Sequence, residues 1–487
     1  MALTVSVAEI VERSNNPLLG KADSWGRVLL GEVATIQNGF AFKSSQFTKD
    51  AGMPLIRIRD VGKDATDTRY VGEYDPAYLV NAGDLLIGMD GDFNSARWHG
   101  EPGLLNQRVC RITLTSDIYH PKLLDYALPG YLKAINEMTS SVTVKHLSSK
   151  SIAAIPLPLP PMEQQESIVA EIEKQFSRLD EAVANLKRVK ANLKRYKAAV
   201  LKAAVEGKLT EEWRKAHPAI EPASKLLGRI LAERRAKWEE AELAKMEAKG
   251  NAPKTDKWKA KYKEPAAPDT TGLPELPKGW VWASYDQVGK LQLGRQRAPK
   301  YHSGPNMRPY LRVQNVFEDR IDLSDVMEMD FPPSDFAKYE LKPGDLLLNE
   351  GQSPELLGRP AIYQGDLPGA CFTNTLIRFK AIEGVIVQFA LHVSRHYMHS
   401  GRFVDEGTIT TNIAHLSVGR LATVEFPLPS SAEQARIVGE VDRHLTLIRE
   451  TETQVDTNLK RAERLRQSIL SGAFSGHLYS SLMQAAS

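Results

Sequence analysis

Two stretches of the chain repeat the same pattern of apolar and polar positions. Residues 158–209 open with PLPPMEQQESIVAEI and residues 427–478 open with PLPSSAEQARIVGEV. Matched positions lie 269 residues apart, without a gap over the whole span. The register extends upstream, where His146-Leu147-Ser148 matches His415-Leu416-Ser417. An ungapped repeat of this length indicates a duplicated unit.

Apolar residues in each copy recur in steps of three and four, which is the spacing of a narrow heptad seam. Lys190 and Lys197 interrupt the first seam, and Glu452 and Arg466 interrupt the second. The first predicted seam comprises Val169, Ile172, Phe176, Leu179, Val183, Leu186, Leu193 and Val200. The second comprises Val438, Val441, Leu445, Ile448, Val455, Leu459, Ala462 and Ile469.

Each copy therefore predicts one long helix. Pro160 and Pro161 stand just ahead of the first helix, and Gly207 and Gly476 stand where each helix would stop. About 40 residues at 1.5 Å each give a rod of roughly 60 Å. A helix with one narrow apolar stripe needs a partner. We expect the duplicate to be that partner; the alternative is two separate core helices in two domains.

The order of the chain favours an antiparallel pair of helices. The first helix leaves the first globular unit and carries the chain to the second unit, and the second helix returns from there. This arrangement places the globular units at opposite ends of the pair, under a pseudo-two-fold axis. The insert between the copies is long enough to permit a parallel pair, so antiparallel pairing is a preference.

The remaining sequence predicts two globular units of mixed short strands and helices. The order shows no regular βαβ alternation, which favours an α+β fold. The stretch at 53–62, MPLIRIRDVG, predicts a strand by its alternation. RPYLRVQNV, PGDLLLNEG and NTLIRF of the second unit parallel MPLIRIRDV, AGDLLIGMDG and NQRVCRI of the first, with drifting spacing. The two units are therefore expected to share a frame and to differ in their loops.

These patterns predict seven segments. They are an N-terminal segment (1–22), a first globular domain (23–157), a central helix (158–209), a charged helical insert with a Pro-rich linker (210–278), a second globular domain (279–426), a C-terminal helix (427–478) and a tail (479–487).

Composition limits the class of protein. The chain has 487 residues, enough for more than one domain, and a net charge of +3. Its only cysteines, Cys110 and Cys371, lie far apart, which argues against a disulfide framework or a cysteine zinc site. No apolar run approaches 18 residues and no secretory signal is recognisable. These features predict a cytoplasmic protein.

No catalytic constellation is found in the sequence. It has no GxxxxGK[ST] loop, no Asn-Pro-Pro-Tyr string, no HExxH and no paired CxxC. Pro268-Asp269, Glu275 and Lys278 imitate a nuclease motif with the wrong spacing. His392, His396 and His399 share one helical face and could hold a metal, although we favour a half-buried polar face. We therefore predict no catalytic residue, no metal site and no cofactor in this chain.

The insert carries a lysine run whose role stays open. Lys254, Lys257, Lys259, Lys261 and Lys263 alternate with Trp258 and Tyr262. A solvated tether is the interpretation we favour, and an arm that contacts phosphates is the alternative.

Binding is the function that remains. Arg, Asn and Gln can distinguish guanine from adenine by bidentate hydrogen bonds, and Lys and Ser typically contact phosphates. His146 and His415 are interpreted as structural. The candidates in the first unit are Asn38, Lys43, Ser44, Arg57, Arg59, Asn94, Arg97 and Lys145. Those in the second are Arg295, Arg297, Lys300, Tyr301, Arg312, Gln314, Asn315, Gln352, Ser353, Asn374, Thr411 and Asn412.

The chain resembles the DNA-specificity subunits of type I restriction-modification enzymes from about Trp25 to Leu478. The resemblance rests on the two repeat openings, the NGFAFKSSQF loop, the GDLL strands, LPELPKGW and the terminal LSGAFSGHL. It implies two target-recognition domains, each followed by a conserved helix, with the helices in an antiparallel coiled coil. The 211–264 insert and Asn349-Glu350-Gly351 depart from the family pattern.

The resemblance also implies partners. The chain would be a non-catalytic reader of a bipartite, asymmetric DNA target. It would assemble with two modification subunits, which bind S-adenosylmethionine and methylate adenine, and with restriction subunits that hydrolyse ATP with Mg²⁺. A coiled-coil adaptor that binds only proteins is the alternative, and a self-sufficient enzyme is disfavoured by the missing motifs.

Overall fold

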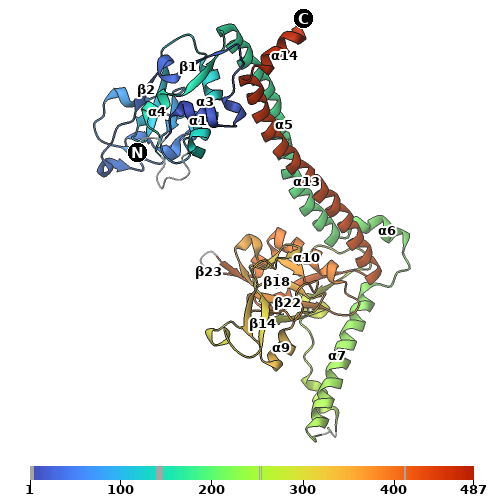
Figure 1. Ribbon diagram of the computed structural model, residues 1–487. Helices are drawn as coiled ribbons and strands as arrows, with labels where there is room; N and C mark the ends of the chain where they lie inside the picture. Colours follow the sequence, from blue (N-terminus) through green and yellow to red (C-terminus); the bar gives the residue numbers. More distant parts are fainter. Residues whose placement is uncertain (1–4, 139–145, 252, 254, 411–412, 487) are drawn as a thin grey trace. The chain divides into compact units, whose positions relative to one another are not determined.

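The chain divides into two compact units, each built around parts of both long helices. The computed structural model describes residues 5–138, 146–251, 253, 255–410 and 413–486 (Figure 1). Unit 1 comprises residues 1–188 and 455–487, and unit 2 comprises residues 189–454. Helices and sheets are mixed in both units, as the α+β prediction requires.

The two long helices have the same length and the same place in the repeat. Helix α5 (Met162–Val205) and helix α13 (Ser431–Phe474) each have 44 residues. Both begin and end at matched positions of the duplication, inside the predicted segments. Each is followed by a glycine with a left-handed backbone, Gly207 at φ 69° and Gly476 at φ 80°, as is common at helix ends.

Unit 1 mixes short strands with helices. Its other elements are α1 (Val7–Arg13), β1 (Gly26–Leu29), α2 (Leu30–Val33), β2 (Ala34–Asn38), β3 (Phe47–Thr48), β4 (Met53–Ile56), β5 (Arg69–Tyr70), β6 (Leu79–Val80), β7 (Leu85–Gly88), β8 (Ser95–Arg97), β9 (Gly103–Leu105), β10 (Val109–Leu114), α3 (Pro121–Met138), α4 (Ser149–Ala153), β11 (Pro156–Leu159) and α14 (His477–Ala486).

Unit 2 follows a similar order after two helices of the insert. Its elements are α6 (Glu211–Ala216), α7 (Ala223–Ala248), β12 (Val281–Ser284), α8 (Tyr285–Val288), β13 (Gly289–Leu293), β14 (Met307–Leu311), β15 (Val316–Phe317), β16 (Arg320–Ile321), β17 (Met327–Asp330), α9 (Pro333–Tyr339), β18 (Leu346–Asn349), β19 (Gly351–Gln352), β20 (Pro360–Ile362), β21 (Cys371–Phe372), β22 (Leu376–Ala381), α10 (Val387–Ser400), α11 (Arg402–Glu406), β23 (Thr408–Thr410), β24 (Ile413–His415), α12 (Val418–Thr423) and β25 (Glu425–Leu428).

The two units share one sheet topology. Unit 1 has a four-stranded antiparallel sheet in the order β2-β10-β7-β8, and unit 2 has the corresponding order β13-β22-β18-β20. A two-stranded sheet of β1 and β11 in unit 1 is matched by β12 and β25 in unit 2. Both predicted GDLL segments run into a central strand, β7 or β18. The shared frame predicted from the parallel strings is therefore present.

Each main core includes residues from both long helices. In unit 1, Ile172 and Phe176 of α5 are buried with Ile469 and Phe474 of α13, together with residues of α1 and α3. In unit 2, Val200 and Leu201 are buried with Val441 and Leu445. Every residue of the two predicted seams is buried or half-buried. Near the helix starts the buried stripe widens, since Ile168 and Ile437 are also buried.

A tryptophan joins the two helices in unit 1. The Trp25 indole N–H donates to the Gln164 side chain at the start of α5, over 2.9 Å. The same ring lies 3.7 Å from the position that a Gly476 Cβ would take, just past the end of α13. Arg466 of α13 pairs with Asp180 of α5 at 2.7 Å. The start of one helix thus lies beside the end of the other, and the two segments are antiparallel.

Unit 2 repeats this junction with Trp280. Its indole N–H donates to Glu433 at the start of α13, over 2.9 Å, and its ring lies 2.9 Å from the position of a Gly207 Cβ, just past the end of α5. Tyr196 and His444 are joined by a hydrogen bond of 2.9 Å farther along the helices. The segments in unit 2 are therefore antiparallel as well.

Several predicted boundaries need correction. The strand predicted at 53–62 ends at Ile56, because the Asp60 carboxylate accepts the backbone N–H of Arg57 and closes a turn. The N-terminal segment is part of unit 1, since Val7 and Ile10 of α1 are buried in its core. Residues 479–486 of the predicted tail belong to helix α14.

The insert is folded against unit 2. Ala223, Leu226 and Ile230 of α7 are buried in the main core of that unit. The predicted linker is docked where it begins: the Ala266 carbonyl accepts the Ser284 hydroxyl at 2.5 Å, and Pro265 is buried. Hydrophobic contacts therefore hold α7 on the globular domain, while residues 267–279 of the linker are exposed or half-buried.

The expectations about the two cysteines and about membrane spans can also be compared with the structure. Cys110 and Cys371 are free and buried, and burial raises the pKa of each thiol to about 12. In the described part of the chain, none of the helices has the length and apolar character needed to cross a membrane.

The junction of unit 2 yields a stability prediction. Glu433 is 4% exposed and accepts hydrogen bonds from Trp280, Thr210 and Arg214. Glu433→Gln removes the charge that pairs with Arg214, so we expect the free energy of unfolding to fall by about 2 kcal/mol. Gln164→Ala, which removes one hydrogen bond at the matched position, should cost about 1 kcal/mol. Urea unfolding measures both; an equal or smaller loss for Glu433→Gln would contradict the assigned role of the pair.

Candidate nucleic-acid interface

A matched set of polar contacts holds the loops of each unit on its sheet. Arg111 of β10 pairs with Asp84 at 3.2 Å and donates to the carbonyl of Leu79. Arg378 of β22 pairs with Asp345 at 3.2 Å and donates to the carbonyl of Glu340. The aspartates of the two GDLL segments are therefore framework residues.

A glycine brings two loops together in each unit. A Cβ at Gly39 would clash with the carbonyl oxygen of Asn106, and a Cβ at Gly294 would clash with that of Thr373. The next residues form parallel bridges, Phe40 with Asn106 and Arg295 with Thr373. The loop after β2 or β13 thus lies beside the turn before β10 or β22. Side chains from both loops can therefore face one ligand.

Three candidates in unit 1 are exposed on loops or turns. Lys43 and Ser44 follow the buried Phe42, and Asn94 lies between β7 and β8. Asn38 is also exposed, and its amide donates to the Ser149 hydroxyl at 3.3 Å. These side chains are available for contacts with a large ligand.

Two other candidates in unit 1, Arg97 and Arg59, have structural partners, and a third, Arg57, is held through its backbone. Arg97 pairs with Asp125 of α3 at 2.7 Å and donates to the Gly83 carbonyl at 2.7 Å. Arg59 pairs with Asp67. Arg57 is half-buried at the turn that ends β4. The prediction that Arg97 reads bases is at odds with this geometry, because its donors are already used inside the domain. Lys145 lies outside the described residues.

Unit 2 presents a basic loop after β13. Arg297 and Lys300 are exposed. The Arg297 guanidinium lies 5.7 Å from the Tyr310 ring centroid, and the Lys300 ammonium lies 4.9 Å from that of the half-buried Tyr301. These contacts orient two cations and leave them accessible to phosphates or base edges.

Four more candidates of unit 2 are at least partly accessible. The Asn374 amide donates to Gln296 at 3.2 Å, which joins the two loops that Gly294 brings together. Gln352 and Ser353 are half-buried on and after β19. Gln314 is exposed and accepts from Arg312. Thr411 and Asn412 lie outside the described residues.

Three candidates in unit 2 are framework residues, contrary to prediction. Arg295 is 6% exposed, lies 3.9 Å from the Tyr301 ring centroid and pairs with Asp335 at 2.9 Å. Arg312 is 7% exposed and pairs with Asp325 at 2.6 Å. Asn315 is 2% exposed and accepts the Arg312 backbone N–H, in the same turn that Asp60 makes in unit 1.

The structure also exposes apolar side chains that a search for polar residues missed. Phe40 is 48% exposed beside its bridge to Asn106. Ile409 and Ile413 are 56% and 49% exposed on the β23–β24 hairpin. Apolar side chains can contact thymine methyl groups or wedge between base steps. The only sequence signal was an aromatic residue inside the polar NGFAF loop.

The paired histidines close corresponding bridges. His146 forms a bridge with Asp90, whose carboxylate lies 2.6 Å from the imidazole. His415 of β24 pairs with Gly351 of β19. These positions fit the structural role predicted for both.

The three histidines of α10 do not form a metal site. Among the described residues, no group of three or more His, Cys, Asp or Glu side chains is placed to hold a metal ion. His392 is 2% exposed, and burial lowers its pKa to about 3; burial likewise lowers the pKa of His396 to about 4. His399 lies 3.1 Å from Glu318. The face is thus buried at His392, half-buried at His396 and exposed at His399, which fits the half-buried polar face that was predicted.

Comparisons with known proteins support a nucleic-acid interface. A family described as type I restriction modification DNA specificity domain matches residues 22–195. The chain is 32% identical to the type I restriction enzyme EcoBI specificity subunit of Escherichia coli, over 98% of this chain and 91% of that protein. It is 22% identical to the EcoKI specificity subunit of Escherichia coli strain K12, over 94% and 89%.

A solved structure has the same fold. A chain from work on complex assembly and conformational transition of the type I R-M system aligns with a TM-score of 0.59 and 16% identity. The alignment covers 94% of this chain and 99% of that one. At this identity the likeness supports the fold alone.

The framework role of Arg312 is testable. Arg312→Ala removes a buried guanidinium that pairs with the exposed Asp325 and donates one further hydrogen bond, to Gln314, so we expect the free energy of unfolding to fall by about 2 kcal/mol. Arg297→Ala, the exposed control, should stay within about 0.5 kcal/mol of the parent chain. Chemical denaturation compares the two. Undiminished stability of Arg312→Ala, with a change in DNA sequence preference, would instead make Arg312 a reading residue.

Proposed function

The chain belongs to the family of type I restriction enzyme specificity subunits, and from this premise we propose that it reads a bipartite, asymmetric DNA target. Unit 1 reads one half-site and unit 2 reads the other. The observation that carries the proposal is a shared frame with unlike loops. Matched arginine–aspartate pairs hold the same sheet in both units. The exposed loop residues differ, because unit 1 presents Lys43 and Asn94 and unit 2 presents Arg297 and Lys300.

The spacing between half-sites is set by the paired helices. Trp25 and Trp280 make the same junction in their own units, with Gln164 and Glu433, which occupy matched positions of the duplication. Equal registers in both units support one continuous antiparallel coiled coil with a pseudo-two-fold axis. Such a rod fixes the distance between two readers, as dimeric DNA-binding proteins fix half-site spacing.

The chain is the recognition subunit of a larger enzyme, and the chemistry belongs to its partners. Two modification subunits bind S-adenosylmethionine and methylate adenine, and restriction subunits hydrolyse ATP with Mg²⁺. The specificity subunit positions them on its target. The adaptor that binds only proteins is not favoured, because the relatives are specificity subunits.

Exposed cations of one unit should affect one half-site. Arg297→Ala should weaken binding by about 1–3 kcal/mol and relax base preference in a single half-site, if its guanidinium contacts a base. Lys300→Ala should instead weaken binding to all sequences and reduce the salt slope by about 1. The assay measures binding of the chain with its modification subunit to duplexes altered in one half-site, across a range of salt concentrations.

A matched pair of variants provides the control. Lys43→Ala and Asn94→Ala should affect only the other half-site, and Arg229→Ala on the insert should affect neither. Binding that does not vary with salt, or variants that change both half-sites together, would favour the adaptor.

Helix length should set the unread gap. Deleting one heptad from each helix, residues 183–189 and the matched residues 452–458, shortens the rod by about 10 Å, or roughly three base pairs. Mapping of methylated adenines in a host that expresses the whole system should show a shorter spacer and unchanged half-sites. The same deletion in α5 alone should abolish methylation, because it breaks the register of the pair. A changed half-site after the paired deletion would refute the rod as a spacer.

A further inference from the structure

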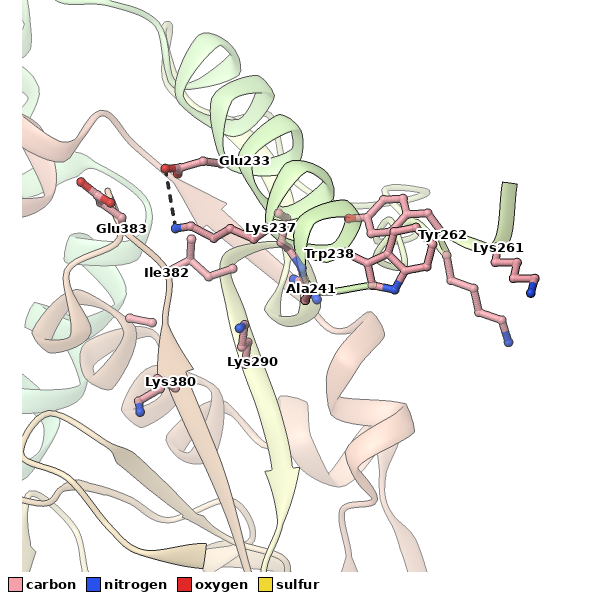
Figure 2. Close-up of a pocket in the computed structure, with 13 residues that line it drawn as sticks. Glu233, Lys237, Trp238, Ala241, Lys261, Tyr262, Lys290, Lys380, Ile382 and Glu383 are labelled. Atoms are coloured by element: carbon pink, nitrogen blue, oxygen red, sulfur yellow. Dashed lines mark ion pairs between the residues drawn. The ribbon is translucent and has the colours of Figure 1, made fainter. Parts of the chain in front are cut away.

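A basic groove lies in unit 2 between the insert and the sheet edge. The cavity has a volume of about 720 Å³. Figure 2 shows one wall made by α7 with Trp238, and the other by the neighbouring strands that carry Lys290 and Lys380. None of the predicted DNA-reading residues lines it.

The insert wall is held in place by aromatic and ionic contacts. Trp238 stacks on Trp258 with ring centroids 5.9 Å apart, and Tyr262 packs on Trp238 at 5.3 Å. Arg234 pairs with Asp286 of α8 at 2.9 Å. Residues 258–262 therefore fold back on α7, and Lys261 lines the groove.

The sheet wall carries an unfavourable pair of like charges. Lys290 of β13 and Lys380 of β22 are direct cross-strand partners, and both are exposed. Like charges directly opposite in an antiparallel pair are destabilising. Asp345 lies 3.8 Å from Lys380 but already pairs with Arg378 at 3.2 Å.

Unit 1 provides an internal comparison. At the same register its β2 and β10 carry Thr35 opposite Thr113, both exposed. Threonine pairs suit this position, so the frame does not require lysines there. The lysine pair occurs in the unit that also has the insert.

The groove has an excess of positive charge. Lys237, Lys261 and Lys263 add to the cross-strand pair, against the carboxylates of Glu233 and Glu383. Glu233 pairs with Lys237 at 3.6 Å. Among the described residues, no carboxylate pairs with Lys261, Lys263 or Lys290.

We propose that this groove binds an extended acidic segment of a partner protein. The lysines are spread along both walls (Figure 2), which suits a chain of carboxylates rather than one compact anion. Trp238, Ala241 and Ile382 offer apolar surface for the aliphatic parts of such a segment. In Figure 1, α7 lies on the opposite side of unit 2 from β23, which carries the exposed Ile409 of the candidate DNA interface.

The test uses the full chain and a ten-residue polyglutamate peptide as probe. Lys290→Thr with Lys380→Thr gives unit 2 the residues of unit 1 and should weaken peptide binding at least about ten-fold. The variant should unfold at about the same temperature, because removal of the repulsive pair offsets the loss of the Lys380 contact with Asp345, which keeps its closer pair with Arg378. Lys245→Thr with Lys249→Thr, an equal charge change elsewhere on the insert, should bind within about two-fold of the parent chain.

Other outcomes would overturn the proposal. Equal peptide binding by the parent chain and the double threonine variant would show that the groove is not the site. Loss of duplex DNA binding alone would assign the lysines to nucleic acid, and equally tight, lysine-dependent binding of inorganic tripolyphosphate would assign them to small anions. The double threonine variant should keep the parent chain's preference for both half-sites. Loss of peptide binding then tests the groove alone, and a failure of the proposed reading function would be seen separately.

Discussion

The structure depends on the junction where the start of one long helix meets the end of the other. In unit 1 the indole of Trp25 donates to Gln164 and packs beside Gly476; in unit 2 Trp280 donates to Glu433 and packs beside Gly207. Each tryptophan belongs to a globular domain, so the junction fixes that domain to both helices at once. A glycine is required past each helix end, because the backbone is left-handed and a Cβ would clash with Ala22 at Gly476 and with Trp280 at Gly207. A long helix that is marginal alone is thereby stabilised at both ends by tertiary packing.

The junction explains why the helices match position for position while the domains do not. A shift of one residue in either helix would rotate its seam away from the partner, so insertions there are costly. Insertions in the exposed loops have no such cost, because the Arg111–Asp84 and Arg378–Asp345 pairs hold the sheet framework. Loops on a fixed scaffold can differ in length and chemistry, which suits two domains that read unlike DNA.

Charge in this protein is divided between framework and surface. Arg97, Arg295 and Arg312 pair with carboxylates of their own domains. Arg297 and Lys300 remain accessible to a ligand. The groove beside α7 differs from both groups, because its opposed lysines repel each other and Lys290 pairs with no carboxylate among the described residues. The Lys290–Lys380 pair is destabilising and has no equivalent in unit 1, so a bound ligand explains its presence better than the fold does.

The sequence by itself determined the duplication, the two long helices with their ends, and the shared frame, because periodicity and repeat register are local properties. It also identified which loops are polar. It did not distinguish Arg297, which is exposed, from Arg295, which is two residues away and packed between aromatic rings. Nor could it show that the insert docks on unit 2 or that Lys290 faces Lys380. Those outcomes depend on which distant side chains occupy the space around a residue, and only the tertiary structure decides that.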